Sequence, residues 1–313
     1  MKRRDFIKKA SVATAGISIL NFSTAFANNR TNDDKLSVSI FSKHLQFLDY
    51  EQTGKMANEL GFSGVDLTVR PKGHVLPERV AVDLPKAIEA IKKGGSTCEM
   101  ITTNVESVYR DLDVSVLETA AKCGVKYYRS NWFKYPENQS MPKSLEMYQK
   151  EIKKLSKLNQ KLGIIGCYQN HAGNKVGASF WEIHTILEKA NPEYFGTQYD
   201  IRHAIAEGTY SWKNGFELLL PHLKTIVLKD FKWEMIDGKW KIVNVPIGEG
   251  MVDFDTYFKL LKKHNLNPPV SLHLEYDLGG AQKGKRVLTV DESVVYDAMR
   301  KDLEKVQLLW EKA

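Results

Sequence analysis

Short apolar runs alternate with longer amphipathic stretches eight times along this 313-residue chain. The runs are rich in β-branched and apolar residues, as expected of buried strands, and lie at 36–41, 64–68, 97–102, 125–129, 164–170, 195–200, 225–229 and 270–275. Stretches with helical spacing lie between them, among them 49–60, 83–93, 114–123, 143–161, 179–189 and 253–263. Eight strand–helix units in about 280 residues predict a single (β/α)8 TIM barrel, an α/β fold.

A doubly wound parallel sheet is the alternative fold for such an alternation. It usually has fewer strands, and no G-x-G-x-x-G follows the first strand here, so no nucleotide cofactor is expected. One segment interrupts the pattern: residues 233–245 alternate in polarity around Asp237-Gly238, which predicts a β-hairpin. The hairpin would follow strand seven, at the catalytic face of the barrel.

The first 27 residues resemble a twin-arginine-type signal peptide. Basic residues including Arg3 and Arg4 precede an apolar stretch that is too short to span a bilayer, and Ala25-Phe26-Ala27 suits cleavage. The alternative is an amphipathic helix of the domain itself. We therefore expect a cleaved segment at 1–27, a flexible mature N-terminus at 28–35, a barrel domain at 36–313, and an exported, periplasmic protein.

Removal of this segment changes what the charge implies. The formal charge of the chain is +7, and the segment holds five basic residues and Asp5, so the mature chain carries +3. That value gives no reason to expect a nucleic-acid partner. The remaining sequence has no long apolar run, so no membrane association is expected after cleavage.

Polar residues gather where the predicted strands end, which in a barrel of this kind is the active-site face. They are Asp66, Arg70, His74, Thr102, Asn104, Arg129, Asn131, Gln169, Asn170, His171, Asp200, Arg202, His203, Lys229, Asp230, His273 and Glu275. A lone strand-end Asp is often a helix cap, and a lone His often only completes a hydrogen-bond network. The prediction of an active site rests on their convergence from several strands.

The ordered motifs GVDLTVRPKGHV, CYQNHAG, YDIRHA, VLKDF, PIGEGMVDF and LHLEY resemble the xylose isomerase-like TIM barrel family. This family includes sugar isomerases, ketose 3-epimerases, endonuclease IV and sugar phosphate isomerase/epimerase-like proteins. The resemblance covers roughly residues 36–305. It implies a sugar isomerase or epimerase, or a carbon–oxygen lyase, that transfers a proton next to a carbonyl. The family's members are often dimers or tetramers, which makes a homo-oligomer compatible with the resemblance.

The resemblance also implies a metal, because the family's epimerases hold one with Glu, Asp, His and Glu from strands five to eight. Asp200 and Glu275 match two of these ligands, whereas Gln169 and Val227 stand at the other two positions. A Mn²⁺ or Mg²⁺ ion would therefore use Asp200, Glu275, Gln169 and His203. In the alternative, Lys229 places an ammonium group near the position of the metal charge. A third reading has Lys229 pair only with Asp230.

The predicted reaction uses one base. Glu275 acts as the base, while Asp200 with a metal or Lys229 stabilises the enolate. The substrate is a sugar or keto-sugar that undergoes isomerisation, epimerisation, or elimination and hydration of a 3-keto-glycoside. Its predicted binding residues are Arg70, His74, Asn131, Trp132, His171, Arg202, His203, Trp233 and His273. A non-catalytic sugar-binding barrel with a degraded metal site is the alternative, followed by an endonuclease IV-like phosphodiesterase.

Overall fold

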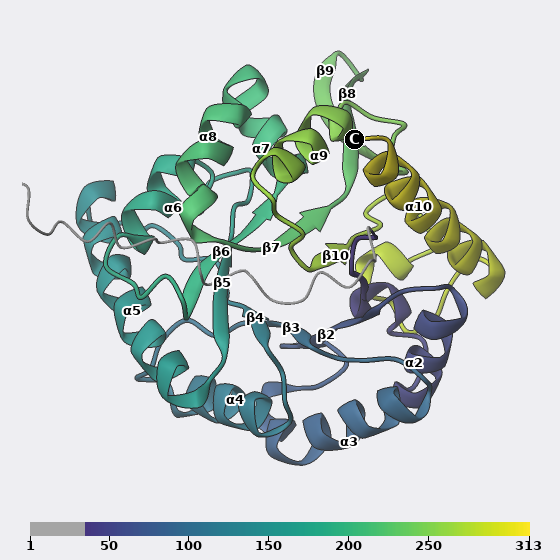
Figure 1. Cartoon of the computed structure of the whole chain (residues 1–313), viewed down its shortest axis with the longest axis horizontal. Coiled ribbons are helices and arrows are strands. Elements are labelled where there is room, and N and C mark those ends of the chain that lie inside the picture. Colours follow the sequence, from purple (N-terminus) through teal and green to yellow (C-terminus); the bar gives the residue numbers. More distant parts are fainter. Residues whose placement is uncertain (1–34) are drawn as a thin grey trace, which may run out of the picture. The chain divides into compact units, whose positions relative to one another are not determined.

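Eight parallel strands close into a barrel in the computed structural model, which describes residues 35–313 (Figure 1). In spatial order they are β1 (Val38–Phe41), β10 (Val270–Leu272), β7 (Leu223–Leu228), β6 (Phe195–Asp200), β5 (Ile165–Gln169), β4 (Tyr127–Arg129), β3 (Met100–Thr103) and β2 (Gly64–Val69). The predicted TIM barrel is thereby confirmed. The predicted signal segment 1–27 and residues 28–34 lie outside the described residues.

Helices surround the barrel and cover the outer faces of its strands (Figure 1). They are α2 (Tyr50–Glu59), α3 (Val80–Lys93), α4 (Asp111–Lys122), α5 (Met141–Leu162), α6 (Phe180–Leu187), α7 (Ile201–Gly208), α8 (Trp212–Leu219), α9 (Phe254–Lys263) and α10 (Glu292–Lys312). Short 3-10 turns lie at Ser42–Leu45 (η1), Pro77–Arg79 (η2), Thr209–Ser211 (η3), Leu220–His222 (η4) and Ala281–Lys283 (η5). No helix within residues 35–313 is long and apolar enough to cross a bilayer.

Local sequence signals set the ends of several helices. The Asp49 side chain caps α2 and the Ser179 side chain caps α6, and in each case the side chain of the third helical residue accepts the capping residue's backbone N–H in return. Gly163 ends α5 in the left-handed conformation, with φ of 70°. Gly54 lets α2 approach α3, because a Cβ at this position would lie 2.3 Å from the Ile91 carbonyl oxygen. These signals fix where each helix lies against the barrel.

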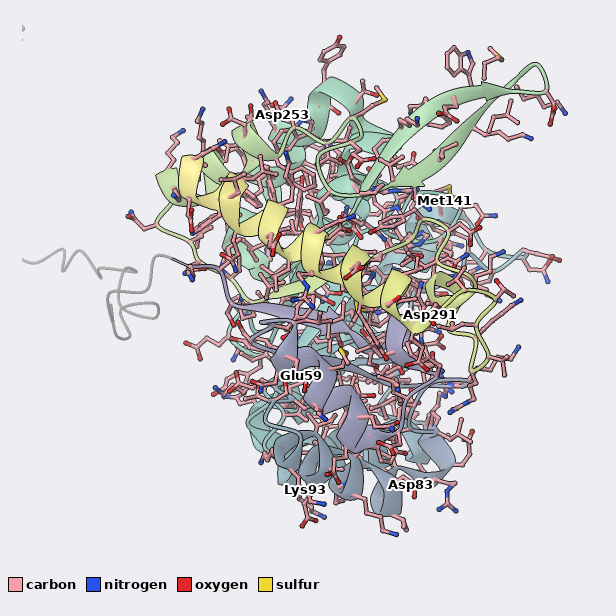
Figure 2. The ribbon with its side chains drawn as sticks, turned by 90° about the vertical axis from the view of Figure 1, so that its right-hand side faces the viewer. Glu59, Asp83, Lys93, Met141, Asp253 and Asp291 are labelled. Carbon is pink, nitrogen blue, oxygen red and sulfur yellow. The ribbon has the colours of Figure 1, made fainter. Side chains whose placement is uncertain are left out.

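The predicted hairpin is confirmed and follows strand seven of the barrel. It consists of β8 (Asp230–Ile236) and β9 (Lys239–Val245), which pair only with each other in an antiparallel ladder. Asp237 and Gly238 have φ of 53° and 72°, as a two-residue primed turn requires. Figure 2 shows this hairpin projecting from the body of the domain.

Asp230 joins the base of the hairpin to the loop that follows it. Its carboxylate accepts backbone N–H bonds from Phe231, Gly248, Gly250 and Val252, at 2.8 to 3.1 Å. The loop passes so close that a Cβ on Gly250 would lie 2.3 Å from Asp230 Oδ1. Asp230 therefore organises the polypeptide after strand seven and is not a partner of Lys229.

Candidate active site

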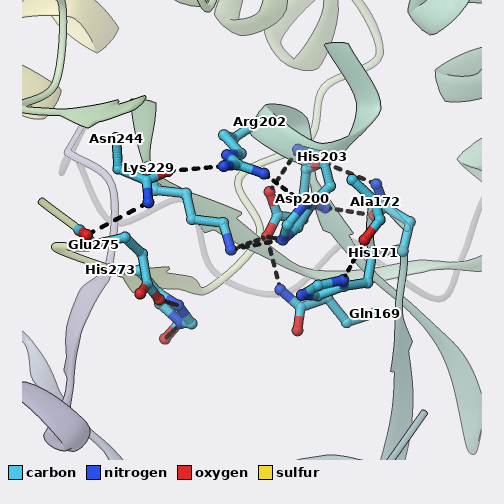
Figure 3. Close-up of polar contacts among 12 residues, drawn as sticks. Gln169, His171, Ala172, Asp200, Arg202, His203, Lys229, Asn244, His273 and Glu275 are labelled. Carbon is cyan, nitrogen blue, oxygen red and sulfur yellow. Dashed lines mark hydrogen bonds and ion pairs between the residues drawn. The ribbon is translucent and has the colours of Figure 1, made fainter. Parts of the chain in front are cut away.

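A buried ion pair between Lys229 and Asp200 lies where β6 and β7 end (Figure 3). Lys229 Nζ is 3.0 Å from Asp200 Oδ2, and the two side chains are 7% and 0% exposed. Asp200 also caps α7, because its Oδ1 accepts the His203 N–H at 3.1 Å. The alternative pairing of Lys229 with Asp230 is wrong, since the Lys229 ammonium group contacts the carboxylate of the neighbouring strand.

Gln169 connects this ion pair to Arg129. Its Nε2 donates to Asp200 Oδ2 at 2.7 Å, and its Oε1 accepts from Arg129 Nη1 at 3.0 Å. The Trp132 indole N–H donates to the Gln169 carbonyl oxygen at 3.0 Å, and the Arg129 guanidinium group lies 4.2 Å from the centre of the Trp132 ring. The neutral amide of Gln169, at a position where the family resemblance implies a Glu, thus donates a hydrogen bond to Asp200, which an ionised carboxylate could not do.

Two imidazole rings lie beside the ion pair (Figure 3). The ring centres of His171 and His203 are 4.0 Å apart, and His203 Nε2 is 2.9 Å from Lys229 Nζ. Arg202 reaches His203 Nδ1 at 3.0 Å and donates to Asn244 Oδ1 on β9 at 2.8 Å. Burial, and then the charge of Lys229, lower the pKa of His171 to about 4 and hold the pKa of His203 well below its ordinary value. Both rings are therefore neutral at neutral pH.

Glu275 forms a second ion pair with Lys43. Lys43 Nζ is 2.8 and 2.9 Å from the two Glu275 oxygens, and His273 Nδ1 is 3.6 Å from Glu275 Oε1. Burial alone would raise the pKa of Glu275, but the His273 contact and the charges of Lys43 and Lys229 outweigh it and hold this pKa well below its usual range. Glu275 is therefore ionised at neutral pH.

His273 is positioned by packing as well as by hydrogen bonds. Its ring stacks on Phe41 of β1 with centres 4.1 Å apart, and its Nε2 is 3.1 Å from Ser271 Oγ. Ser271 in turn donates to Asp66 Oδ2 at 2.6 Å, across the barrel from β10 to β2. Strand β10 ends at Leu272, three residues before the predicted end, yet the His273 N–H still bonds the Leu228 carbonyl oxygen of β7 at 3.0 Å. This hydrogen bond continues the ladder between β10 and β7 by one residue and so fixes the backbone of His273.

The remaining predicted binding residues lie apart from the two ion pairs. His74 Nδ1 is 3.1 Å from Ser42 Oγ and its Nε2 is 3.2 Å from the Leu45 carbonyl oxygen, so both nitrogens serve the packing of the first two loops. Asn131 Nδ2 donates to Glu106 Oε1 at 2.5 Å. Trp233 lies on the hairpin and is 40% exposed. The structure does not bring these three side chains into contact with Lys229 or Glu275.

A divalent metal does not fit this set of residues. Asp200 Oδ2 binds the Lys229 ammonium group and the Gln169 amide, while Lys43 engages both oxygens of Glu275. Mg²⁺ and Mn²⁺ require several oxygen ligands with free lone pairs. In the part of the chain that the structure describes, no three His, Cys, Asp or Glu side chains are arranged to hold a metal ion. The predicted metal site at Asp200, Glu275, Gln169 and His203 is therefore not formed.

The barrel mouth instead carries an excess of positive charge. Five basic side chains interact electrostatically with three carboxylates there: Lys43, Arg70, Arg129, Arg202 and Lys229 with Asp66, Asp200 and Glu275. Lys43 and Asn244 were not among the residues predicted from sequence. Lys43 comes two residues after Phe41, the last residue of β1, so a polar residue at the end of the first strand was the available signal.

The chain belongs to the xylose isomerase-like TIM barrel family, whose model matches residues 54–290. Comparison with curated protein sequences gave no significant match. Among solved structures, it is similar to a xylose isomerase-like TIM barrel protein from Mycobacterium smegmatis in complex with magnesium. The TM-score is 0.63 at 10% identity, over 88% of this chain and 98% of that one.

Two other similar structures are described as enzymes. One is a 3-keto-D-glucoside 4-epimerase from E. coli, with TM-score 0.62 and 12% identity over 86% of this chain and 99% of that one. The other is a probable 3-DHS dehydratase from Bacillus anthracis that is involved in petrobactin synthesis. Its TM-score is 0.60 at 13% identity, over 86% of this chain and 98% of that one. At these identities the likeness establishes the fold.

Proposed function

We propose that this protein is an exported sugar-processing enzyme that transfers a proton at the carbon next to a carbonyl, with a lysine in place of the metal charge. The single observation that carries the proposal is the Lys229–Asp200 ion pair, at 3.0 Å in the centre of the barrel mouth. It provides a fixed cation where negative charge develops on a carbonyl oxygen. The similar structures that are a keto-glucoside epimerase and a probable dehydratase support this class of chemistry.

In the proposed reaction, Glu275 accepts the proton from the carbon beside the carbonyl. The C–H bond breaks, its electron pair forms the C=C bond of an enolate, and the carbonyl π pair moves onto oxygen, where Lys229 stabilises it. Return of the proton to the former carbonyl carbon, with transfer of the neighbouring hydroxyl proton to the enolate oxygen, completes an isomerisation. Loss of a β-substituent with its bonding electron pair completes an elimination. Epimerisation needs a proton delivered to the opposite face of the same carbon, which Glu275 alone does not supply. Because Gln169 stands where the family resemblance implies a second Glu and Asp200 is paired with Lys229, Glu275 is the one carboxylate that we assign as a base.

The low pKa of Glu275 has two effects on this reaction. It keeps the carboxylate ionised, and it weakens the carboxylate as a base. The same cations that lower this pKa, Lys43 and Lys229, also stabilise the enolate and so make the substrate carbon more acidic. The difference between the pKa of Glu275 and the pKa of the substrate C–H group decides the rate of proton transfer. In the substrate complex the cations therefore need to lie nearer to the substrate oxygen than to Glu275.

Deuterium exchange tests the proposal. Purified protein is incubated in D₂O with a panel of hexoses, ketoses and 3-keto-glycosides, and the carbon-bound deuterium is followed by NMR. We expect exchange that Glu275→Gln and Lys229→Met abolish, that an excess of EDTA leaves unchanged, and that the exposed control Glu51→Gln retains. A sugar that binds without exchange would instead support the non-catalytic sugar-binding barrel. Exchange that requires added Mn²⁺ would overturn the role given to Lys229.

A further inference from the structure

Arg129 holds a buried donor without a protein partner, and the half-buried Arg70 beside it also forms no side-chain hydrogen bond within residues 35–313. Arg129 is 4% exposed, and within the described part of the chain its side chain donates one hydrogen bond, to Gln169, while its Nε has no partner. The Arg70 guanidinium group lies over the Phe41 ring, 5.4 Å from its centre, and no hydrogen bond from this group is formed within residues 35–313. Buried guanidinium donors are normally paired, because leaving them without a partner costs free energy.

The carboxylates in reach of these two arginines are bound elsewhere. Asp66 accepts hydrogen bonds from the hydroxyl groups of Thr102 at 3.1 Å and Ser271 at 2.6 Å, and not from either arginine. Asp200 and Glu275 are paired with lysines. Burial, followed by the like charge of Arg70, lowers the pKa of Arg129 to about 9. The two guanidinium groups thus repel each other, and the Asp66 carboxylate, which attracts both, forms no hydrogen bond with either of them.

The position of the arginines relative to the reacting groups is set by the barrel. Arg129 is the last residue of β4 and Arg70 follows the last residue of β2, and these strands are separated only by β3. Lys229 and Glu275 follow the neighbouring strands β7 and β10, and β10 is separated from β2 only by β1. A substrate between the two groups therefore has one end at the arginines and its reacting carbon at Glu275.

We propose that Arg70 and Arg129 form an oxyanion subsite that holds a carboxylate of the substrate, which makes the substrate a sugar acid. This inference rests on the proposed function for the reacting end of the molecule. The planar fork of each guanidinium group matches a carboxylate. The charge balance supports a monoanion, because five cations face three carboxylates and leave two charges unmatched. One carboxylate and one enolate oxygen neutralise both, whereas a phosphate dianion would consume both before the reaction begins.

Binding of simple ligands tests the subsite without requiring turnover. D-Glucuronate, D-galacturonate, D-glucose and glucose 6-phosphate are titrated into the wild-type chain by calorimetry, at low and high salt. We expect a uronate to bind at least about tenfold more tightly than the hexose, with a preference that salt weakens. Arg70→Gln should remove most of this preference. Lys72→Gln, which removes an exposed charge two residues away, should leave it intact.

Other results would overturn the subsite. Equal affinities for uronate and hexose, a tighter sugar phosphate, or an unchanged preference in Arg70→Gln each contradict it. Arg129→Gln is measured alongside, with its unfolding curve to show that the barrel is intact. The proposed function fails separately: a uronate preference without any deuterium exchange at carbon supports the subsite and rejects the reaction.

Discussion

The Lys229–Asp200 ion pair makes a quantitative prediction, because both charges are buried and a mutation of one leaves the other without a partner. At 3.0 Å and an effective dielectric constant near 20, their attraction is about 5 kcal/mol. Lys229→Met removes this attraction but leaves the Asp200 charge in place, and the expected loss of unfolding free energy is about 3–5 kcal/mol. Asp200→Asn should cost a similar amount, because it leaves a buried ammonium group.

The double variant separates the charge from the packing. In Lys229→Met/Asp200→Asn no buried charge is left unpaired, and the Asn oxygen can still accept the His203 N–H that caps α7. We expect the double variant to lose about 2–3 kcal/mol less unfolding free energy than the sum of the two single losses. Deuterium exchange should stay abolished in all three variants.

Urea unfolding of the four proteins measures this coupling. The matched control is the exposed pair Lys259–Asp255 on α9, whose atoms are 2.8 Å apart with side chains 56% and 59% exposed. The same two substitutions there should couple by about 0.5 kcal/mol or less. Additive losses at Lys229 and Asp200, of the size seen at the control pair, would refute the view that this is a desolvated ion pair.

Three further predictions concern other parts of the molecule. Burial raises the pKa of Asp302 to about 7 from an ordinary value of 3.8, so between these pH values the folded state keeps a proton that the unfolded state loses. The free energy of unfolding should therefore fall by up to about 4 kcal/mol as the pH rises from 4 to 7. Urea unfolding of Asp302→Asn should show a flatter decline. Gly250→Ala should destabilise the protein by about 1–3 kcal/mol, because its methyl group collides with Asp230, and a thermal melt unchanged from wild type would contradict the close approach. Lys43→Gln should raise the pKa of Glu275 and move the acid limb of the kcat/KM profile to higher pH. A profile that does not move would show that Lys43 does not lower the pKa of Glu275.

The sequence was sufficient to predict the parts of this molecule that depend on local periodicity. The barrel follows from eight alternations of a short apolar run with a longer stretch of helical spacing, and the hairpin follows from Asp237-Gly238, whose backbone preference belongs to those two residues. Most polar residues of the mouth were predicted for a similar reason, since they follow strand ends directly.

The pairing of these residues could not be predicted in the same way. Lys43 and Glu275 are 232 positions apart, and only closure of the barrel brings them together. The choice of Lys229 between Asp230 and Asp200 depends on the loop around Gly250, whose backbone N–H groups satisfy Asp230 and leave Asp200 to the lysine. The four predicted metal ligands are not arranged as a metal site for this reason, because the ligand types were known from the sequence while the hydrogen bonds that occupy their lone pairs were not.

The seam between β1 and β10 has a consequence for how the chain folds. Val38, Ser39 and Ile40 pair with Val270, Ser271 and Leu272, so the first and last strands of the barrel are hydrogen-bonded neighbours. Until the last strand is synthesised, two open sheet edges remain and the loop between them cannot be closed. Such non-local pairing slows folding. The barrel is therefore completed only after nearly the whole chain has been made. A truncation before residue 270 would expose two strand edges with unpaired N–H and C=O groups, which promote aggregation, whereas the closed barrel has no such edge.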